Sequence, residues 1–279
     1  MHKTVQDIMQ MKKEKKKISV ITSYDYTLAS LCDKAGIDVL LVGDSAGMVM
    51  LGYENTIPVT MDQMCMFTEA VSRARKNSLL VSDLPFMSYQ ASVEDAINNS
   101  GKLIKAGADA IKLEGGSIMA ETISAIVDVG IPVMGHIGLQ PQTTMLSEGY
   151  KVQGKTKDSA MKLIEDAKDL EDAGVFSIAL EMVSHEVAQI ISETVSVPVI
   201  GIGSGVNCDG QVLVVQDLLG MYDKIKPKFA KRYMNLSEDI VKALGDYRKD
   251  IESGEFPAEE NSFSMNEEEL KKLREKIGS

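Results

Sequence analysis

The sequence predicts an α/β fold, a closed (β/α)8 barrel of parallel strands with a helical extension at its C-terminal end. Short apolar runs rich in β-branched residues alternate with amphipathic segments along most of the chain. This alternation is typical of successive βα units and a parallel sheet. Several of the apolar runs end at an acidic residue, and a barrel of parallel strands brings such positions together at one rim.

Eight segments have the strand pattern. They cover residues 18–22, 38–43, 78–83, 109–114, 131–136, 176–181, 197–202 and 211–216. Eight strands in one continuous alternation favour a barrel over an open doubly wound sheet, which usually has fewer strands and a nucleotide fingerprint near its start. Only about eight residues separate the last two segments, too few for a full crossover helix. Either this crossover is a single turn or one of the two strands is misplaced.

Capping signals mark the ends of several predicted helices. Thr60 and Ser92 each precede a helical pattern and are followed three residues later by Gln or Asp, as in an N-terminal capping box. Gly107, Gly130 and Gly174 stand just before the fourth, fifth and sixth strands. Glycine suits the left-handed residue that ends a helix, so these positions are predicted helix ends.

Length alone allows one or two domains, and the continuous alternation of strands and helices favours a single domain over residues 1–279, with a charged, helix-prone segment from about residue 237. The lysine-rich run at residues 12–17 lacks the apolar stretch of a signal peptide, and we interpret it as the solvated face of a helix. Apolar runs are too short to cross a membrane. We therefore expect a soluble, cytoplasmic protein.

The charge balance indicates a small-molecule partner. The chain has 30 basic and 41 acidic residues and a net charge of -11, which argues against binding to nucleic acid or to an anionic membrane. Its cysteines, Cys32, Cys65 and Cys208, are odd in number and far apart. We expect reduced thiols that form neither disulfides nor a metal site.

Four carboxylates stand at the ends of predicted strands and define the candidate site. They are Asp44, Asp83, Glu114 and Glu181. Acidic groups that converge at one rim need a cation, and hard oxygen ligands without cysteine or paired histidine favour Mg2+. We expect Asp44, Asp83 and Glu114 to be its ligands, some of them through water, since magnesium gives up its hydration shell reluctantly.

Lys112 lies two residues before Glu114 on the same strand, so both side chains point to the same face and can reach the barrel mouth. A lysine there needs a carboxylate or an anionic substrate beside it. It could also act as a Schiff-base nucleophile. The neighbouring acids should raise its pKa and keep it protonated, which favours substrate binding over imine formation.

Glu181 is the candidate general base, because it ends a more apolar run than the other three carboxylates do. Desolvation in such surroundings raises the pKa of a carboxylate towards the neutral range. A nearby cation would lower this pKa, and the sequence does not show which effect dominates. His136 follows the fifth strand and could orient a ligand, as a possible second-shell residue, or be purely structural. The glycine-rich residues 201–205 could cradle a phosphate or form a tight turn.

Together these residues indicate chemistry on a 2-oxo acid. Magnesium chelated by the ketone and carboxylate oxygens would stabilise an enolate, a base would remove the proton next to the carbonyl, and the enolate carbon would attack an electrophile. Residue chemistry alone leads to metal-dependent enolisation and names no substrate.

Many short motifs also occur in one order along the chain. They are 21–26 (ITSYDY), 41–45 (LVGDS), 58–59 (PV), 83–87 (DLPFM), 111–116 (IKLEGG), 135–139 (GHIGL), 149–154 (GYKVQG), 180–181 (LE) and 198–203 (PVIGIG). In these motifs the chain resembles the ketopantoate hydroxymethyltransferase family over about residues 3 to 265. Glu148 departs from the pattern, since a glycine is common there.

The resemblance implies a magnesium-dependent barrel enzyme of pantothenate and coenzyme A synthesis. It would transfer a one-carbon unit from 5,10-methylenetetrahydrofolate to 3-methyl-2-oxobutanoate and form 2-dehydropantoate. Asp44, Asp83 and Glu114 would form the metal sphere. Asp44, Ser45, Asp83 and Lys112 would contact the oxo acid, and Glu181 would accept the proton. The family also implies a cytoplasmic homo-oligomer, commonly a decamer.

Two other interpretations stay open at this point. A related magnesium-dependent 2-oxo-acid lyase or mutase would use similar carboxylates on the same barrel without folate. A non-catalytic barrel that acts as a binding or scaffold protein would bind neither magnesium nor an oxo acid.

Overall fold

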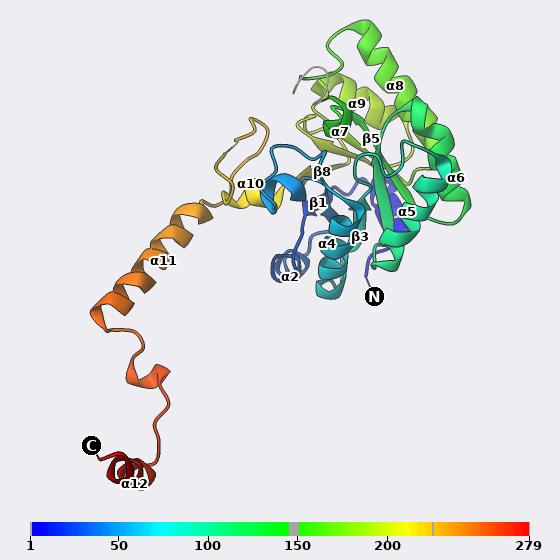
Figure 1. The fold of residues 1–279 in the computed structure, drawn as a ribbon. Helices are drawn as coiled ribbons and strands as arrows, with labels where there is room; N and C mark the ends of the chain where they lie inside the picture. The colour runs from blue at the N-terminus through cyan, green and yellow to red at the C-terminus, as the bar shows by residue number, and fades with distance from the viewer. Residues whose placement is uncertain (1, 145–150, 225, 279) are drawn as a thin grey trace.

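A computed structural model gives the structure of the protein and describes residues 2–144, 151–224 and 226–278. Eight parallel strands form a closed barrel in sequence order, which confirms the predicted (β/α)8 fold (Figure 1). The strands are Ile18–Thr22 (β1), Val39–Val42 (β2), Leu79–Asp83 (β3), Ala110–Glu114 (β4), Val133–Gly138 (β5), Ser177–Glu181 (β6), Val199–Ile202 (β7) and Gly210–Leu213 (β8). Ser147 and Glu148 lie outside the described residues.

Helices surround the barrel and continue beyond it (Figure 1). They are Val5–Lys13 (α1), Tyr26–Lys34 (α2), Ala46–Val49 (α3), Met61–Ala74 (α4), Val93–Lys105 (α5), Ala120–Asp128 (α6), Pro141–Thr144 (α7), Lys157–Asp172 (α8), His185–Thr194 (α9), Val215–Leu219 (α10), Leu236–Ser253 (α11) and Glu267–Ile277 (α12), with 3-10 turns at Ser117–Met119 (η1) and Glu259–Asn261 (η2).

Side chains alternate between the inside of the barrel and the helical layer, because successive residues of a strand point to opposite faces. On β2, Val39 and Leu41 belong to the cluster inside the barrel, whereas Leu40 and Val42 pack with the helices. Ile8 of α1 is fully buried in the inner cluster, so α1 packs against the interior of the barrel. The alternation sends the polar residues at the strand ends into the barrel mouth.

The strand register sets these polar residues side by side. Asp83 on β3 pairs with Lys112 on β4, and Glu114 pairs with His136 on β5. Glu181 on β6 is the partner of Gly138. Functional side chains that are far apart in sequence therefore occupy neighbouring positions on one rim.

The eighth strand differs from its predicted bounds of 211–216. It ends at Leu213, and α10 begins at Val215, whose amide donates to the Thr22 hydroxyl at 3.0 Å. A short apolar run does not by itself distinguish a strand from the start of a buried helix, which explains the error. Both final strands exist, and residues 203–209 join them without a helix.

The predicted solvated face at residues 12–17 is also partly wrong. The helix ends at Lys13, and Lys12 donates to the carbonyls of Ser192 and Val197 and pairs with Asp209 at 2.9 Å. Its ammonium group satisfies carbonyl groups at the end of α9 and before β7, and Lys17, although exposed, donates to the Cys208 carbonyl in the β7–β8 loop at 2.6 Å. The lysines at 13, 15 and 16 are exposed. A run of like charges conceals such a contact because nothing in the pattern singles out one member.

The capping predictions are confirmed at Thr60 and in half at Ser92. Thr60 and Gln63 form a complete capping box at the start of α4. The Ser92 hydroxyl accepts the Asp95 amide at 3.0 Å and donates to the Asp95 carboxylate, but the structure shows no return bond from the Ser92 backbone amide to Asp95. The glycines predicted to end helices all have positive φ angles, 105° at Gly107 for example. The three cysteines are free.

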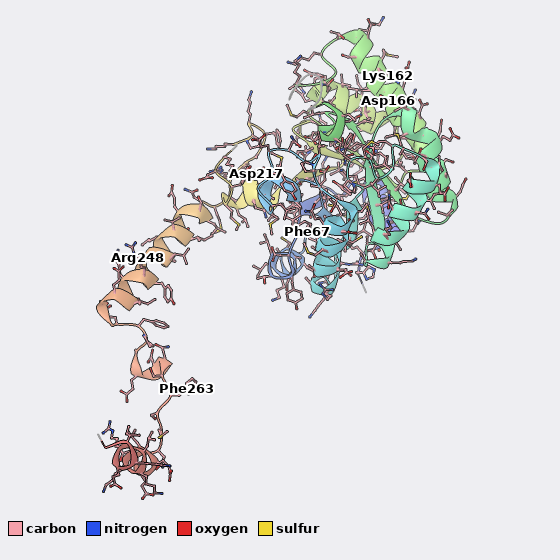
Figure 2. The ribbon with its side chains drawn as sticks, in the orientation of Figure 1. Phe67, Lys162, Asp166, Asp217, Arg248 and Phe263 are labelled. Atoms are coloured by element: carbon pink, nitrogen blue, oxygen red, sulfur yellow. The ribbon has the colours of Figure 1, made fainter. Side chains whose placement is uncertain are left out.

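The segment after residue 236 is helical, as expected, and leads away from the barrel. Neither α11 nor α12 has a buried residue. Figure 2 shows Arg248 on α11 and Phe263 beyond it, far from Phe67 in the barrel domain. Among the described residues, no helix is both long enough and apolar enough to span a membrane.

Candidate active site

A cavity of about 400 Å³ opens at the carboxyl ends of the strands. All eight strands contribute to its lining, and its size is that of a site for a small organic molecule. The seven residues singled out in the sequence line it together: Asp44, Ser45, Asp83, Lys112, Glu114, His136 and Glu181. The structure thus brings together every candidate site residue in one cavity.

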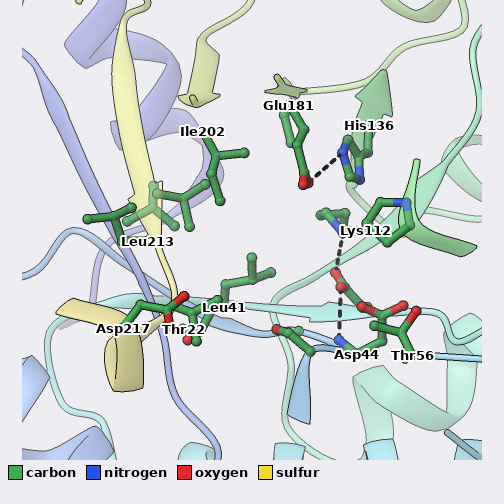
Figure 3. A pocket seen from close by; sticks show the side chains of 18 of the residues that line it. Thr22, Leu41, Asp44, Thr56, Lys112, His136, Glu181, Ile202, Leu213 and Asp217 are labelled. Atoms are coloured by element: carbon green, nitrogen blue, oxygen red, sulfur yellow. Dashed lines mark hydrogen bonds and ion pairs between the residues drawn. The ribbon is translucent and has the colours of Figure 1, made fainter. Parts of the chain in front are cut away.

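The cavity has two unlike sides (Figure 3). Polar and charged groups come from the ends of β2 to β6. The opposite side, from β7, β8 and β1, is mostly apolar and includes Ile202, Leu213 and Val20. One side of the cavity is therefore suited to charged groups and the other to apolar groups.

A buried ion pair stands at the centre of the polar side. The Lys112 ammonium donates to Asp83 Oδ1 at 2.8 Å, and both side chains are less than a tenth exposed. The Asp44 amide donates to the other Asp83 oxygen at 3.1 Å. Asp83 therefore positions both the lysine and the loop that follows β2.

Burial and charge together shift the pKa values in this group. Desolvation opposes the charge on Lys112, but Asp83, Asp44 and Glu114 outweigh it and raise the pKa of the ammonium group. The expected protonated lysine is thus supported. Desolvation, then the Asp83 charge, raises the pKa of Asp44 to about 6, and desolvation with the Asp44 charge raises that of Glu114 well above its usual value.

His136 lies between two carboxylates. Its Nε2 is 3.4 Å from Glu181 Oε2 and its Nδ1 is 3.6 Å from Glu114 Oε1. Both distances are short enough for an ion pair if the ring is protonated. However, neither nitrogen forms a hydrogen bond of good geometry within the described residues. Desolvation and the Lys112 charge lower the pKa of the ring. A buried imidazole with two unpaired nitrogens is unusual and indicates a group that meets a ligand.

Gln142 is a residue of the site that the sequence reasoning missed. Its Nε2 donates to Asp44 Oδ2 at 2.9 Å and to the Leu84 carbonyl at 3.0 Å, and its Oε1 accepts from Tyr89 at 2.8 Å. Its backbone amide donates to Glu114 Oε2 at 3.0 Å. Gln142 therefore orients two of the carboxylates, Asp44 with its side-chain amide and Glu114 with its backbone amide. Gln142 follows the 135–139 motif closely, which was the available signal.

Ser45 begins the short helix α3 at the cavity wall. Its hydroxyl is 2.8 Å from the Tyr24 hydroxyl, which holds it in place beside Asp44. Burial raises the pKa of Tyr24 far above its usual value, so this phenol stays protonated. The hydroxyl pair can offer a donor to an anionic ligand.

The backbone around Glu181 is tightly constrained. Gly138 has a φ of 93°, and a Cβ on it would lie 2.2 Å from the Glu181 carbonyl oxygen. Met182, directly after Glu181, has a φ of 47°, which is strained for a residue with a side chain. The close β5–β6 contact and this strained residue fix the direction of Glu181.

The glycine-rich residues 201–205 form a tight turn that supports the same strand end. The Ser204 hydroxyl donates to the Leu180 carbonyl at 2.7 Å and accepts from the Val183 amide at 3.1 Å. A Cβ on Gly205 would lie 2.5 Å from His185 Cβ. These contacts agree with the turn interpretation, in which glycine permits close approach of two chain segments.

The described residues contain no group of three or more His, Cys, Asp or Glu side chains arranged to hold a metal ion. Lys112 and Gln142 occupy positions between the carboxylates that such a group would need. A site for magnesium here would use few direct protein ligands, with water and substrate oxygens completing the sphere. Magnesium commonly binds in this way.

A (β/α)8 barrel with buried carboxylates, a lysine and a histidine at the carboxyl rim defines the class of barrel enzymes that act on small molecules. A model of the ketopantoate hydroxymethyltransferase family matches residues 2–259. The chain is 89% identical over its full length to the 3-methyl-2-oxobutanoate hydroxymethyltransferase of Nitrosopumilus maritimus (strain SCM1), also covered fully. It is 58% identical to that of Cenarchaeum symbiosum (strain A), covering 91% of this chain and 96% of the relative.

The chain therefore belongs to the ketopantoate hydroxymethyltransferase family, and it is an enzyme, a hydroxymethyl-transferring transferase.

Solved structures share the fold at low identity. A phosphonopyruvate hydrolase complex with oxalate and Mg++ has a TM-score of 0.62 at 11% identity and covers 100% of this chain and 95% of the other. A 2,3-dimethylmalate lyase has a TM-score of 0.58 at 14% identity and covers 99% and 100%.

Proposed function

We propose that this enzyme transfers a hydroxymethyl group from 5,10-methylenetetrahydrofolate to 3-methyl-2-oxobutanoate and forms 2-dehydropantoate, a step in pantothenate and coenzyme A biosynthesis. One observation supports it most: a protonated lysine and four inward-facing carboxylates line the polar side of a single cavity. This arrangement suits an anionic 2-oxo acid with a cation beside it.

The residues present fit a magnesium ion. Asp44, Asp83 and Glu114 supply hard oxygen atoms, and the raised pKa values of Asp44 and Glu114 show that their negative charges are poorly compensated. We expect Asp44 and Asp83 to hold the ion directly and Glu114 to hold it through water. When bound, the ion supplies positive charge next to the oxo acid and so favours loss of a proton from its C3 atom.

Lys112 and Ser45 bind and orient the oxo acid in this proposal. The Lys112 ammonium offers donors beyond the one used by Asp83, and its raised pKa keeps it positive throughout the neutral range. It therefore attracts the substrate carboxylate and does not form an imine. The Ser45 hydroxyl, held by Tyr24, offers a further hydrogen bond.

Glu181 takes the proton from C3. Its side chain is 15% exposed, the most accessible of the four rim carboxylates, and His136 Nε2 lies 3.4 Å from it. His136 stays neutral because its pKa is lowered, and its Nε2 lies beside the carboxylate, where it can share the transferred proton. The backbone constraint at Gly138 holds Glu181 in this position.

The atoms balance in three stages. The C3–H bond breaks, its proton goes to Glu181, and its electron pair becomes the enolate. Water adds to the methylene carbon of the donor as its two C–N bonds break, so that the two water protons go to the two nitrogens of tetrahydrofolate and the carbon becomes a formaldehyde unit. The enolate carbon then bonds to this carbon, and the resulting alkoxide takes the proton from Glu181. The apolar side of the cavity provides the space for the donor.

A transfer assay with donor labelled with 13C in its methylene group tests this function. The label should appear in the hydroxymethyl carbon of 2-dehydropantoate, and chelation of magnesium should stop its transfer. Glu181→Gln should lower the rate by at least about 100-fold, the usual range for a general base. Glu186→Gln is the matched control, because Glu186 is exposed on α9 and outside the cavity. Turnover of the oxo acid without the donor would instead indicate a lyase or mutase.

We further propose that the chain is one barrel domain with a helical tail, and that it forms a cytoplasmic homo-oligomer, a decamer by family resemblance. Exposed apolar side chains on α11 support self-association, since Val241, Leu244 and Tyr247 are 71%, 62% and 52% exposed. Sedimentation velocity would measure the mass, and a monomer at micromolar concentration would contradict the proposal.

A further inference from the structure

The apolar side of the cavity ends at a carboxylate that the proposed chemistry does not use. Asp217 lies on α10, just beyond β8, and lines the cavity opposite Lys112 and His136 (Figure 3). Its residue is only 9% exposed. Between the two ends stand mostly apolar side chains such as Leu213 and Ile202.

The Asp217 carboxylate has no hydrogen-bond donor among the residues that the structure describes. Burial raises its pKa, and among the described residues the charge of Arg232 opposes this shift. The Arg232 guanidinium donates to the Tyr222 carbonyl at 2.9 Å and makes no hydrogen bond to Asp217. A buried carboxylate without donors is costly unless a ligand supplies them.

Two aromatic side chains line the same cavity as this carboxylate. They are Tyr222 and Phe229. The Phe229 ring packs so closely on Gly203 that a Cβ there would lie 3.0 Å from it. The Thr22 hydroxyl already accepts the Val215 amide. The charged residues on this side are Asp217, which is buried, and Lys228, which is exposed. Aromatic faces with one acid at the end are suited to a planar ring that carries N–H groups along one edge.

The oxo acid does not fit this end of the cavity. It is an anion, and Asp217 repels anions, whereas Lys112 attracts them. The cavity of about 400 Å³ also extends beyond the space that a five-carbon acid beside Lys112 would fill. The remaining ligand is the one-carbon donor.

We propose that Asp217 binds the N–H edge of the donor's heterocycle, the adjacent ring N–H and amino group of a pterin, while the ring lies against the apolar side. The inference rests on the proposed function, because that function supplies the donor. Two parallel N–H donors match the two oxygens of one carboxylate, which gives both affinity and orientation. The methylene carbon then faces the polar side, where the enolate forms.

The test compares Asp217→Asn with wild type, because asparagine keeps the shape and removes the charge. Asp223→Asn is the matched control, since Asp223 is exposed and outside the cavity lining. Calorimetry measures binding of tetrahydrofolate and of its analogue without the 2-amino group. NMR measures exchange of the C3 proton of the oxo acid in D2O without donor.

We expect Asp217→Asn to weaken tetrahydrofolate binding by about 10- to 100-fold, the effect of a hydrogen-bonded charge. The same variant should bind tetrahydrofolate and the analogue equally, whereas wild type prefers tetrahydrofolate. C3 exchange should stay within about twofold of wild type, because Asp217 lies away from the polar side. Thermal unfolding verifies that the variant is folded.

Unchanged tetrahydrofolate affinity in Asp217→Asn would overturn the inference, and so would an equal loss of C3 exchange and of binding. Equal affinities of wild type for the two pterins would also overturn it. Failure of the proposed function is separate, because it would appear as absence of C3 exchange in wild type with magnesium.

Discussion

Replacing Asp44 with asparagine should stabilise the magnesium-free protein at neutral pH. Desolvation and the Asp83 charge raise the pKa of Asp44 from 3.8 to about 6 in the folded protein. Below pH 3.8 the group is protonated in both the folded and the unfolded chain, so it does not affect stability. Between pH 3.8 and about pH 6, the Asp44 carboxyl group ionises more readily in the unfolded chain than in the folded protein. The folded protein therefore loses stability as the pH rises through this range, and the loss is complete above about pH 6.

The magnitude follows from the shift. A difference of about 2 pKa units at 1.36 kcal/mol each corresponds to about 3 kcal/mol of lost stability above pH 6. The asparagine has no charge to desolvate and can still accept the hydrogen bond from Gln142. We expect a gain of about 2 to 3 kcal/mol, or about 5 to 10 °C in melting temperature for a chain of this size.

The assay is thermal and urea unfolding at about pH 4 and about pH 7.5, with a chelator and then with magnesium. The variant should exceed wild type in stability at the higher pH and lose most of this advantage at the lower one. Magnesium should stabilise wild type and leave the variant nearly unchanged, because a ligand stabilises only the state that binds it. Transfer activity should be lost.

Two results would refute the reasoning. Lower stability of Asp44→Asn than of wild type at about pH 7.5 without magnesium would show that the buried charge is not destabilising. An equal effect of magnesium on both proteins would remove Asp44 from the metal site. Asp223→Asn serves as the control, since this exposed change should alter stability by less than about 0.5 kcal/mol.

Three further changes test the supporting structure. Gln142→Leu leaves buried groups of Asp44 and its neighbours without donors, so it should cost about 2 to 4 kcal/mol in urea unfolding and slow C3 exchange. Lys112→Met leaves Asp83 buried and unpaired, which should cost about 3 to 5 kcal/mol and abolish calorimetric binding of the oxo acid. Ser204→Ala removes two hydrogen bonds at the end of β6 and should cost about 1 to 3 kcal/mol.

Each of these has a contradicting result. Wild-type exchange in Gln142→Leu would show that the amide does not orient the carboxylates. Oxo-acid binding by Lys112→Met with wild-type affinity would place the substrate elsewhere. Unchanged stability in Ser204→Ala would mean that water replaces its contacts.

Much of the site follows from strand periodicity. Lys112 and Glu114 alternate with residues that face the helices, and His136 has the same inward parity as Met134. Since parallel strands end at one rim, acids at their ends had to converge. The sequence therefore predicted the barrel and the members of the polar side.

Contacts that depend on the third dimension could not be predicted. Gln142 meets Asp44 across 98 residues, and no local pattern connects them. Residues 214–216 were predicted to belong to the eighth strand, which concealed the helix α10 that carries Asp217. Lys12 stood in a run of like residues and yet pairs with Asp209. For Gln142 and Lys12, tertiary packing selects one partner among several that the sequence allows.

The most direct test of the central claim is exchange of the C3 proton of 3-methyl-2-oxobutanoate in D2O, followed by proton NMR with and without magnesium. The account predicts magnesium-dependent loss of the C3 signal with wild type and with Glu186→Gln, and none with Glu181→Gln. Exchange that persists in Glu181→Gln at the wild-type rate would contradict Glu181 as the base. Exchange that is unaffected by a chelator would contradict the role of the metal.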